Sequence, residues 1–147
     1  MIQINYEQLL KLVLPEAIVV VTALFVMAVD LLALRKRPVG TRFTVAATLA
    51  SLGCAFAIAR ILFAPTQANI LDGMLIANPL THLVQIALLV LTIFTLLLSV
   101  GSKFTEHVGE FVLLILLATA GMMFLIGTQD LLVIFISLEL LSLSLYI

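Results

Sequence analysis

Residues 131–147 read LLVIFISLELLSLSLYI, an apolar run that contains one charged residue, Glu139. A helix that crosses the bilayer core needs about 20 consecutive, mostly apolar residues. Four more apolar stretches of about this length precede the run. Each is continuously apolar, whereas the strands of membrane barrels alternate between apolar and polar residues. The pattern predicts an all-α integral membrane protein, a bundle of about five transmembrane helices.

The composition favours the same class of protein. Of the 147 residues, 64% are hydrophobic and only 10% are charged, and the mean hydropathy is +1.34. Soluble domains have about 25% charged residues, so this chain cannot cover a core with a polar surface. The net charge is −1, and no long basic run or Cys/His cluster occurs. We therefore expect the lipid bilayer as a partner, and neither nucleic acid nor a metal ion.

Five helices are expected in a single membrane segment. Pro15 suits the first turn of the first helix, where its missing N–H needs no partner. The ten residues after Phe63, with Asp72-Gly73 as a turn signal, are expected to form a loop. The predicted helices cover residues 15–34, 43–63, 79–100, 110–127 and 130–147.

The basic residues predict an orientation. Four of them, Arg35, Lys36, Arg37 and Arg42, lie in the first connection, and Lys103 lies in the third. The second and fourth connections have none. Because basic residues accumulate in cytoplasmic loops, the N-terminus is expected outside, and the fifth helix is expected to run from outside to inside.

Glu139 is the principal candidate for a functional residue. It follows Asp130 by nine residues, about 13–14 Å along a helix axis, and half of the hydrocarbon core is about 15 Å. An acid near the midplane is costly and usually functional, which favours a proton relay. The alternative is a neutral glutamic acid that links helices by a hydrogen bond. Four residues share its helix face: Phe135, Ile136, Ser142 and Leu143.

Secondary candidates for proton transfer are Glu110, His82 and Asp130. Glu110 opens the fourth predicted helix, where the helix dipole favours an acid. His82 can titrate near neutral pH, although a lone histidine is more often a hydrogen-bonded packing residue. Asp130, or Thr128 before it, can cap the last helix.

The remaining polar groups favour structural roles. Glu16 is expected in the first turn of its helix, within reach of water. Asp30 lies about one turn before Arg35, and either a local salt link or solvation at the membrane interface explains it. One face of the third predicted helix is polar, which is typical of an interhelical packing seam. This face carries Thr81, Gln85, Thr92 and Ser99.

The sequence contains no motif for redox chemistry or for nucleotide hydrolysis. We find no phosphate-binding P-loop, no GxGxxG motif after a strand and no HExxH motif. A bis-His haem pair and a cysteine cluster for an iron–sulfur centre are also missing. The chain is therefore expected to carry no cofactor.

The last part of the chain resembles a known family. Residues 109–147, GEFVLLILLATAGMMFLIGTQDLLVIFISLELLSLSLYI, are similar to the fourth and fifth helices of subunit N of bacterial NADH:quinone oxidoreductase, respiratory complex I. The GEF start, the ATAGMM stretch, the short connection at Asp130 and the LELLSLSLY segment carry the resemblance. Weaker support comes from Pro15-Glu16, Asp30-Leu31, Asp72-Gly73 and Leu98-Ser99.

The resemblance implies a membrane-arm subunit that takes part in proton translocation coupled to quinone reduction. It implies an antiporter-like subunit of 14 helices in the bacterial inner membrane, with an outside N-terminus. Glu139 would match the glutamate that pairs with a lysine on the seventh helix. NADH, flavin, iron–sulfur clusters and quinone would be bound by other subunits of the complex, which would be the protein partners.

Two alternatives remain open at the level of sequence. The chain could be a subunit of a multi-subunit cation/proton antiporter, or a five-span membrane scaffold in which Glu139 only links helices. The run ends at Tyr146-Ile147 without a polar flank, so we expect an N-terminal fragment of a longer chain.

Overall fold

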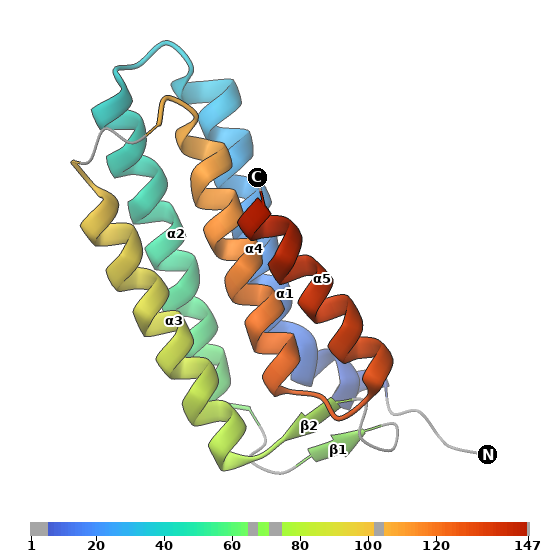
Figure 1. Cartoon of the computed structure of the whole chain (residues 1–147). Coiled ribbons are helices and arrows are strands. Elements are labelled where there is room, and N and C mark those ends of the chain that lie inside the picture. The colour runs from blue at the N-terminus through green and yellow to red at the C-terminus, as the bar shows by residue number, and fades with distance from the viewer. Residues whose placement is uncertain (1–5, 65–67, 71–74, 102–104, 147) are drawn as a thin grey trace.

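The computed structural model describes residues 6–64, 68–70, 75–101 and 105–146. Within these ranges the chain forms five α-helices, one π-helical turn and a short β-hairpin (Figure 1). The elements are α1 (Tyr6–Val29), η1 (Asp30–Leu34), α2 (Val39–Leu62), β1 (Ala68–Ile70), β2 (Leu75–Ala77), α3 (Pro79–Ser99), α4 (Val108–Ile126) and α5 (Leu131–Tyr146).

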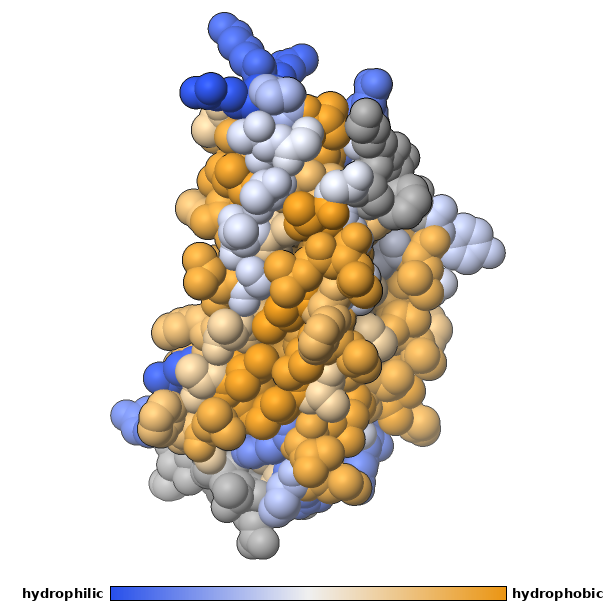
Figure 2. Space-filling model, turned by 90° about the vertical axis from the view of Figure 1, so that its left-hand side faces the viewer, coloured by the Kyte–Doolittle hydropathy of each residue, from blue (hydrophilic) through white to orange (hydrophobic). Residues whose placement is uncertain are grey.

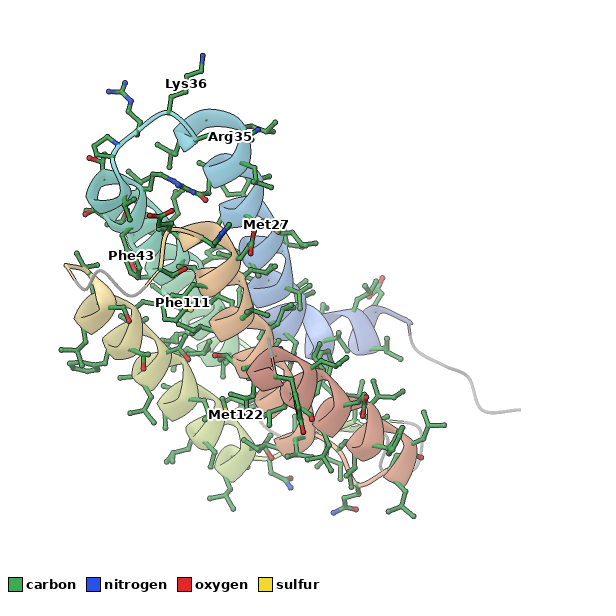
Figure 3. All side chains as sticks on the ribbon, turned by 45° about the horizontal axis from the view of Figure 1, so that its top comes forward. Met27, Arg35, Lys36, Phe43, Phe111 and Met122 are labelled. Carbon is green, nitrogen blue, oxygen red and sulfur yellow. The ribbon has the colours of Figure 1, made fainter. Side chains whose placement is uncertain are left out.

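Four helices surround a common core. Helices α1, α2 and α3 follow one another side by side, and α4 packs against all three of them. Helix α5 packs mainly on α4, on the outside of this four-helix group (Figure 1). The hairpin and the start of α5 lie at one end of the bundle, and the α1–α2 connection lies at the other. Figure 3 shows Arg35 and Lys36 projecting from that second end.

The outer surface of the bundle is apolar. Figure 2 shows one face on which a hydrophobic band covers the middle, while the most hydrophilic residues lie toward the ends. Four helical segments are long and apolar enough to cross a membrane, namely Leu9–Leu34, Val39–Leu62, Pro79–Ser99 and Val108–Ile126. Helix α5 is also apolar but shorter. The chain is a multi-pass helical membrane protein, as the composition predicts.

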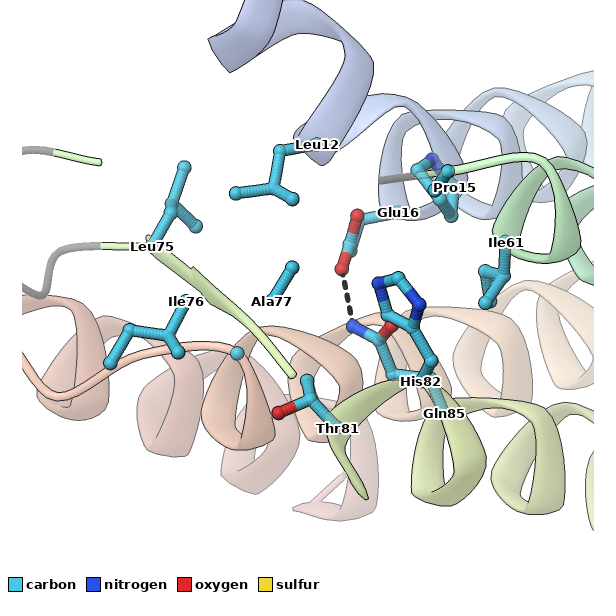
Figure 4. Close-up of a pocket in the computed structure, with 12 residues that line it drawn as sticks. Leu12, Pro15, Glu16, Ile61, Leu75, Ile76, Ala77, Thr81, His82 and Gln85 are labelled. Atoms are coloured by element: carbon cyan, nitrogen blue, oxygen red, sulfur yellow. Dashed lines mark hydrogen bonds between the residues drawn. The ribbon is translucent and has the colours of Figure 1, made fainter. Parts of the chain in front are cut away.

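The first helix begins earlier than expected. It starts at Tyr6 rather than at Pro15, so Pro15 lies inside α1. Residues 6–14 are rich in Leu, Glu, Gln and Lys, which favour helices. A proline inside a helix removes one hydrogen bond and bends the axis, and α1 changes direction in this region (Figures 1 and 4). The prediction that Glu16 occupies a first turn is therefore wrong.

The expected loop after α2 contains part of a β-hairpin. Strands β1 and β2 are antiparallel, with Asn69 opposite Ile76. The Ile76 amide donates to the Gly127 carbonyl over 2.8 Å, which ties the hairpin to the α4–α5 connection. The Asp72-Gly73 turn signal lies outside the described residues, as does Lys103.

Small residues allow close helix contacts, as is common in membrane bundles. A Cβ at Gly121 of α4 would lie 3.1 Å from the Ser137 carbonyl oxygen and 3.2 Å from the Leu141 nitrogen, both on α5. A Cβ on Gly53 of α2 would lie only 2.8 Å from the Cβ of Thr22 on α1. Both positions therefore need glycine at the observed helix spacing.

Candidate functional site: an outward acid on α5 and two buried polar clusters

Glu139 lies on the face of α5 that points away from α4. It is eight residues from the start of α5, about 12 Å along the axis. Its side chain is exposed on the surface of the chain, whereas Ser137 and Ser144 face α4 and are buried. The other residues predicted to share its face are exposed as well. They are Phe135, Ile136, Ser142 and Leu143.

The surroundings of Glu139 are apolar. Phe135 is 67% exposed and Leu143 is 54% exposed, so large hydrophobic side chains stand on both sides of the acid. Among the residues that the structure describes, no hydrogen bond or ion pair reaches its carboxyl group. No lysine or arginine follows Lys103 in the sequence. The acid thus lies at mid-helix without a counter-charge among the described residues.

Glu110 and Asp130 have local roles. Glu110 lies in the first turn of α4, as predicted, and its carboxylate oxygen is 3.4 Å from Nδ1 of His107. Both side chains are largely exposed. Asp130 Oδ1 accepts the Leu132 amide over 2.8 Å and the Val133 amide over 3.2 Å. The prediction that Asp130 caps the last helix is confirmed. None of these contacts of Glu110 and Asp130 involves Glu139.

Asp30 forms a buried ion pair at the other end of the bundle. Its side chain is only 3% exposed. Oδ1 accepts a hydrogen bond of 2.8 Å from Nε of Arg42, and Oδ2 accepts one from Nη2 of the same guanidinium. Oδ2 also accepts the Gly109 amide over 3.1 Å. The predicted link to Arg35 is wrong, because the fold places Arg42 of α2 against the buried face of η1.

This cluster joins three helices. Arg42 also donates to the Glu106 carbonyl over 3.2 Å, just before α4. A Cβ on Gly109 would lie 2.8 Å from Oδ2 of Asp30. Nearby, the rings of Phe43 and Phe111 meet at a centroid distance of 6.0 Å (Figure 3). The arrangement is a rigid anchor between α1, α2 and α4.

Glu16 forms a second buried cluster, near the hairpin end. It is only 5% exposed. Its Oε1 accepts Nε2 of Gln85 over 2.8 Å (Figure 4), and the same Nε2 lies 3.4 Å from the Met123 carbonyl oxygen. His82 stands one turn before Gln85 and is half-buried, beside Glu16. The sequence predicts structural roles for Glu16 and Gln85 and makes His82 a secondary candidate for proton transfer, but it does not predict that the three lie together.

The polar face of α3 is a packing seam, as predicted. Thr81, Gln85, Thr92 and Ser99 are all buried, at spacings that place them on one side of the helix. The hydroxyl groups of Thr92 and Thr119 share a hydrogen bond of 2.9 Å between α3 and α4. Polar contacts of this kind hold membrane helices together where the surroundings offer no hydrophobic driving force.

The helices and their buried polar contacts define a multi-pass membrane bundle with an acid displayed on its outermost helix. No family model matches the chain. It is 42% identical, over 98% of its length, to NADH-quinone oxidoreductase subunit N 2 of Acidobacterium capsulatum. It is 34% identical, over 92% of its length, to NAD(P)H-quinone oxidoreductase subunit 2 of Synechococcus elongatus. Over the part that aligns, the chain is a homologue of NADH-quinone oxidoreductase subunit N and of NAD(P)H-quinone oxidoreductase subunit 2.

The similarity extends over almost the whole chain but only part of each relative. The chain spans 31% of the length of the Acidobacterium protein and 26% of the Synechococcus protein. The relatives are thus between three and four times as long as the sequence. Their names match the family that the resemblance at residues 109–147 implies.

Proposed function

We propose that this chain contributes five membrane helices to the membrane arm of an NADH-quinone oxidoreductase, respiratory complex I, of the bacterial inner membrane. In this role it takes part in proton translocation coupled to quinone reduction. Glu139 is the intramembrane acid of the relay. Electron transfer from NADH and quinone binding belong to other subunits of the complex, which are the partners of this chain.

The observation that carries the proposal is the position of Glu139. An acid with no ionic partner among the described residues sits at mid-helix, on a surface of large apolar side chains. Such a group in a membrane segment is expensive, and its usual compensation is a partner of opposite charge or a water-filled path. The open face of α5 leaves room for that partner on a further helix.

An outside N-terminus completes the proposed topology. The basic residues Arg35, Lys36 and Arg37 at one end of the bundle would then face the cytoplasm, and the hairpin end would face the periplasm. Helix α5 would cross from the periplasmic side inward. Glu16 would lie nearer to the periplasmic end of α1, and Glu139 would lie at the middle of α5.

The test is Glu139→Gln in the assembled complex, reconstituted into vesicles. Glutamine keeps the size and the hydrogen-bonding capacity of the side chain but cannot titrate. We expect the complex to assemble and to oxidise NADH, with fewer protons moved per NADH. A pH-sensitive dye inside the vesicles measures the proton yield, and NADH absorbance measures electron transfer.

Glu106→Gln is the matched control, because it makes the same substitution on an exposed acid outside the helices. We expect it to leave the proton yield unchanged. A Glu139→Gln complex that assembles normally and keeps the full proton yield would contradict the relay role. The alternative, a residue that only holds helices together by a hydrogen bond, predicts normal assembly and that same full proton yield, because glutamine keeps the hydrogen bond.

A further inference from the structure

A small cavity lies beside Glu16, between α1, α3 and β2. Its volume is about 20 Å³. A cavity of roughly 10–15 Å³ on this measure already accommodates one water molecule. Glu16, Thr81, His82 and Gln85 supply the polar part of its wall (Figure 4). The space is therefore large enough for one water and is lined by groups that can hold it.

One oxygen of Glu16 lacks a partner. Oε1 accepts from Gln85, but Oε2 is fully buried and has no hydrogen bond among the described residues. A buried polar atom without a hydrogen-bond partner destabilises the fold, because the atom has lost its contacts with water. Whether the carboxyl group is neutral or charged, Oε2 needs a donor or an acceptor beside it. A water in the adjoining cavity meets that need in either state.

The cluster lies too deep in the bundle for Oε2 of Glu16 to form its hydrogen bond with bulk water. Gln85 lies six residues from the start of α3, about 9 Å along the axis. With the start of α3 at the edge of a hydrocarbon core of about 30 Å, this depth would lie inside one half of the core. The rest of its lining is apolar side chains and backbone, which include Leu12, Pro15 and Ile61. A buried polar group here must be satisfied by the protein or by a captured water.

His82 supplies the second titratable group of the pocket. The imidazole lies beside the Glu16–Gln85 pair in Figure 4. It is half-buried, whereas Glu16 is almost wholly buried. The residues that α2, β2 and the α4–α5 connection place around the cavity, Ile61, Leu75, Ile76, Ala77 and Gly127, are not titratable. The imidazole is thus the more accessible titratable group, and the carboxyl group is the interior one.

We propose that the cavity binds one water between Oε2 of Glu16 and the imidazole of His82, and that this acid–water–imidazole unit is a proton-exchange site. In the inward step, the imidazolium releases a proton to the water, and the water passes one of its own protons to Oε2. The reverse step returns the proton to the imidazole. Glu16 thereby exchanges protons with the hairpin end of the bundle, independently of Glu139.

The first test is a structure of the full-length complex at a resolution that shows buried waters. We expect a water within hydrogen-bonding distance of Oε2 in the wild type. His82→Leu should lose this water, and His82→Gln should keep it. An empty cavity in a wild-type map that shows buried waters elsewhere would overturn the proposal.

The second test measures proton exchange by infrared difference spectroscopy of the complex after transfer from H₂O to D₂O. Glu16→Gln identifies the carboxyl component by removing it. We expect His82→Gln, which cannot titrate, to slow exchange of that component on the order of tenfold, as for the loss of one hydrogen-bonded step. His107→Gln, at an exposed histidine, should leave the rate unchanged. A wild-type rate in His82→Gln, or a spectrum without any component that Glu16→Gln removes, would refute proton exchange at this site. Both readouts are independent of proton pumping through Glu139.

Discussion

Removal of the charge on Asp30 should destabilise the bundle through a single, well-defined cluster. Asp30→Asn keeps the shape of the side chain but takes away the counter-charge of Arg42. Two donors of the guanidinium and the Gly109 amide converge on this carboxylate. Breaking a buried ion pair on one side costs about 3–5 kcal/mol. Since 15% of the Arg42 side chain is exposed and can reach water, we expect a loss near the lower limit, about 3 kcal/mol.

Equilibrium unfolding of the protein in mixed detergent micelles, followed by helical circular dichroism, measures this loss. The pair is best examined by a double-mutant cycle with Arg42→Gln. Because each single variant already breaks the ion pair, the double variant should be little worse than either one, with a coupling of about 1–3 kcal/mol. Additive losses, or an Asp30→Asn protein as stable as the wild type, would refute the assignment of the pair as an anchor.

Three further substitutions test the helix contacts by the same unfolding assay. Gly53→Ala should cost about 1–3 kcal/mol, because the added methyl group overlaps Thr22; Gly40→Ala, with nothing within 4 Å, is the control and should be neutral or slightly stabilising. Thr119→Val removes the hydroxyl contact with α3 and should cost about 0.6 kcal/mol and no more than about 1.7 kcal/mol. Asp130→Ala removes the cap of α5 and should cost about 1 kcal/mol. A loss for Gly40→Ala equal to that for Gly53→Ala would mean that the helix spacing is not the cause.

Helical periodicity explains what the sequence could predict. The spacing of Thr81, Gln85 and Thr92 places them on one side of α3, and the structure buries that side. The same periodicity predicts that four residues share the α5 face of Glu139, and these four and Glu139 are all exposed. Both predictions depend only on neighbours within one helix, where geometry follows directly from sequence.

Partners between helices were harder to predict. Asp30 has Arg35 close by in sequence, yet its partner is Arg42, because η1 and α2 lie against each other after the turn. Glu16 and Gln85 are 69 residues apart, and they meet because α1 and α3 both pack against α4. Pro15 misled the prediction, since it is read most simply as a helix start, while favourable residues before it extend the helix.

The contacts of Asp30 also set an order for biosynthesis. A chain enters the membrane from its N-terminus, so α1 is present long before its neighbours. The Arg42 guanidinium is synthesised 12 residues after Asp30, whereas the Gly109 amide follows only after 79 residues. Asp30 therefore gains its counter-charge with the second helix, but its last hydrogen bond only when the fourth helix leaves the insertion machinery. Until then the face of the first helix that carries Asp30 must remain accessible to α4. The release of α4 from the insertion machinery then completes the contacts of this cluster.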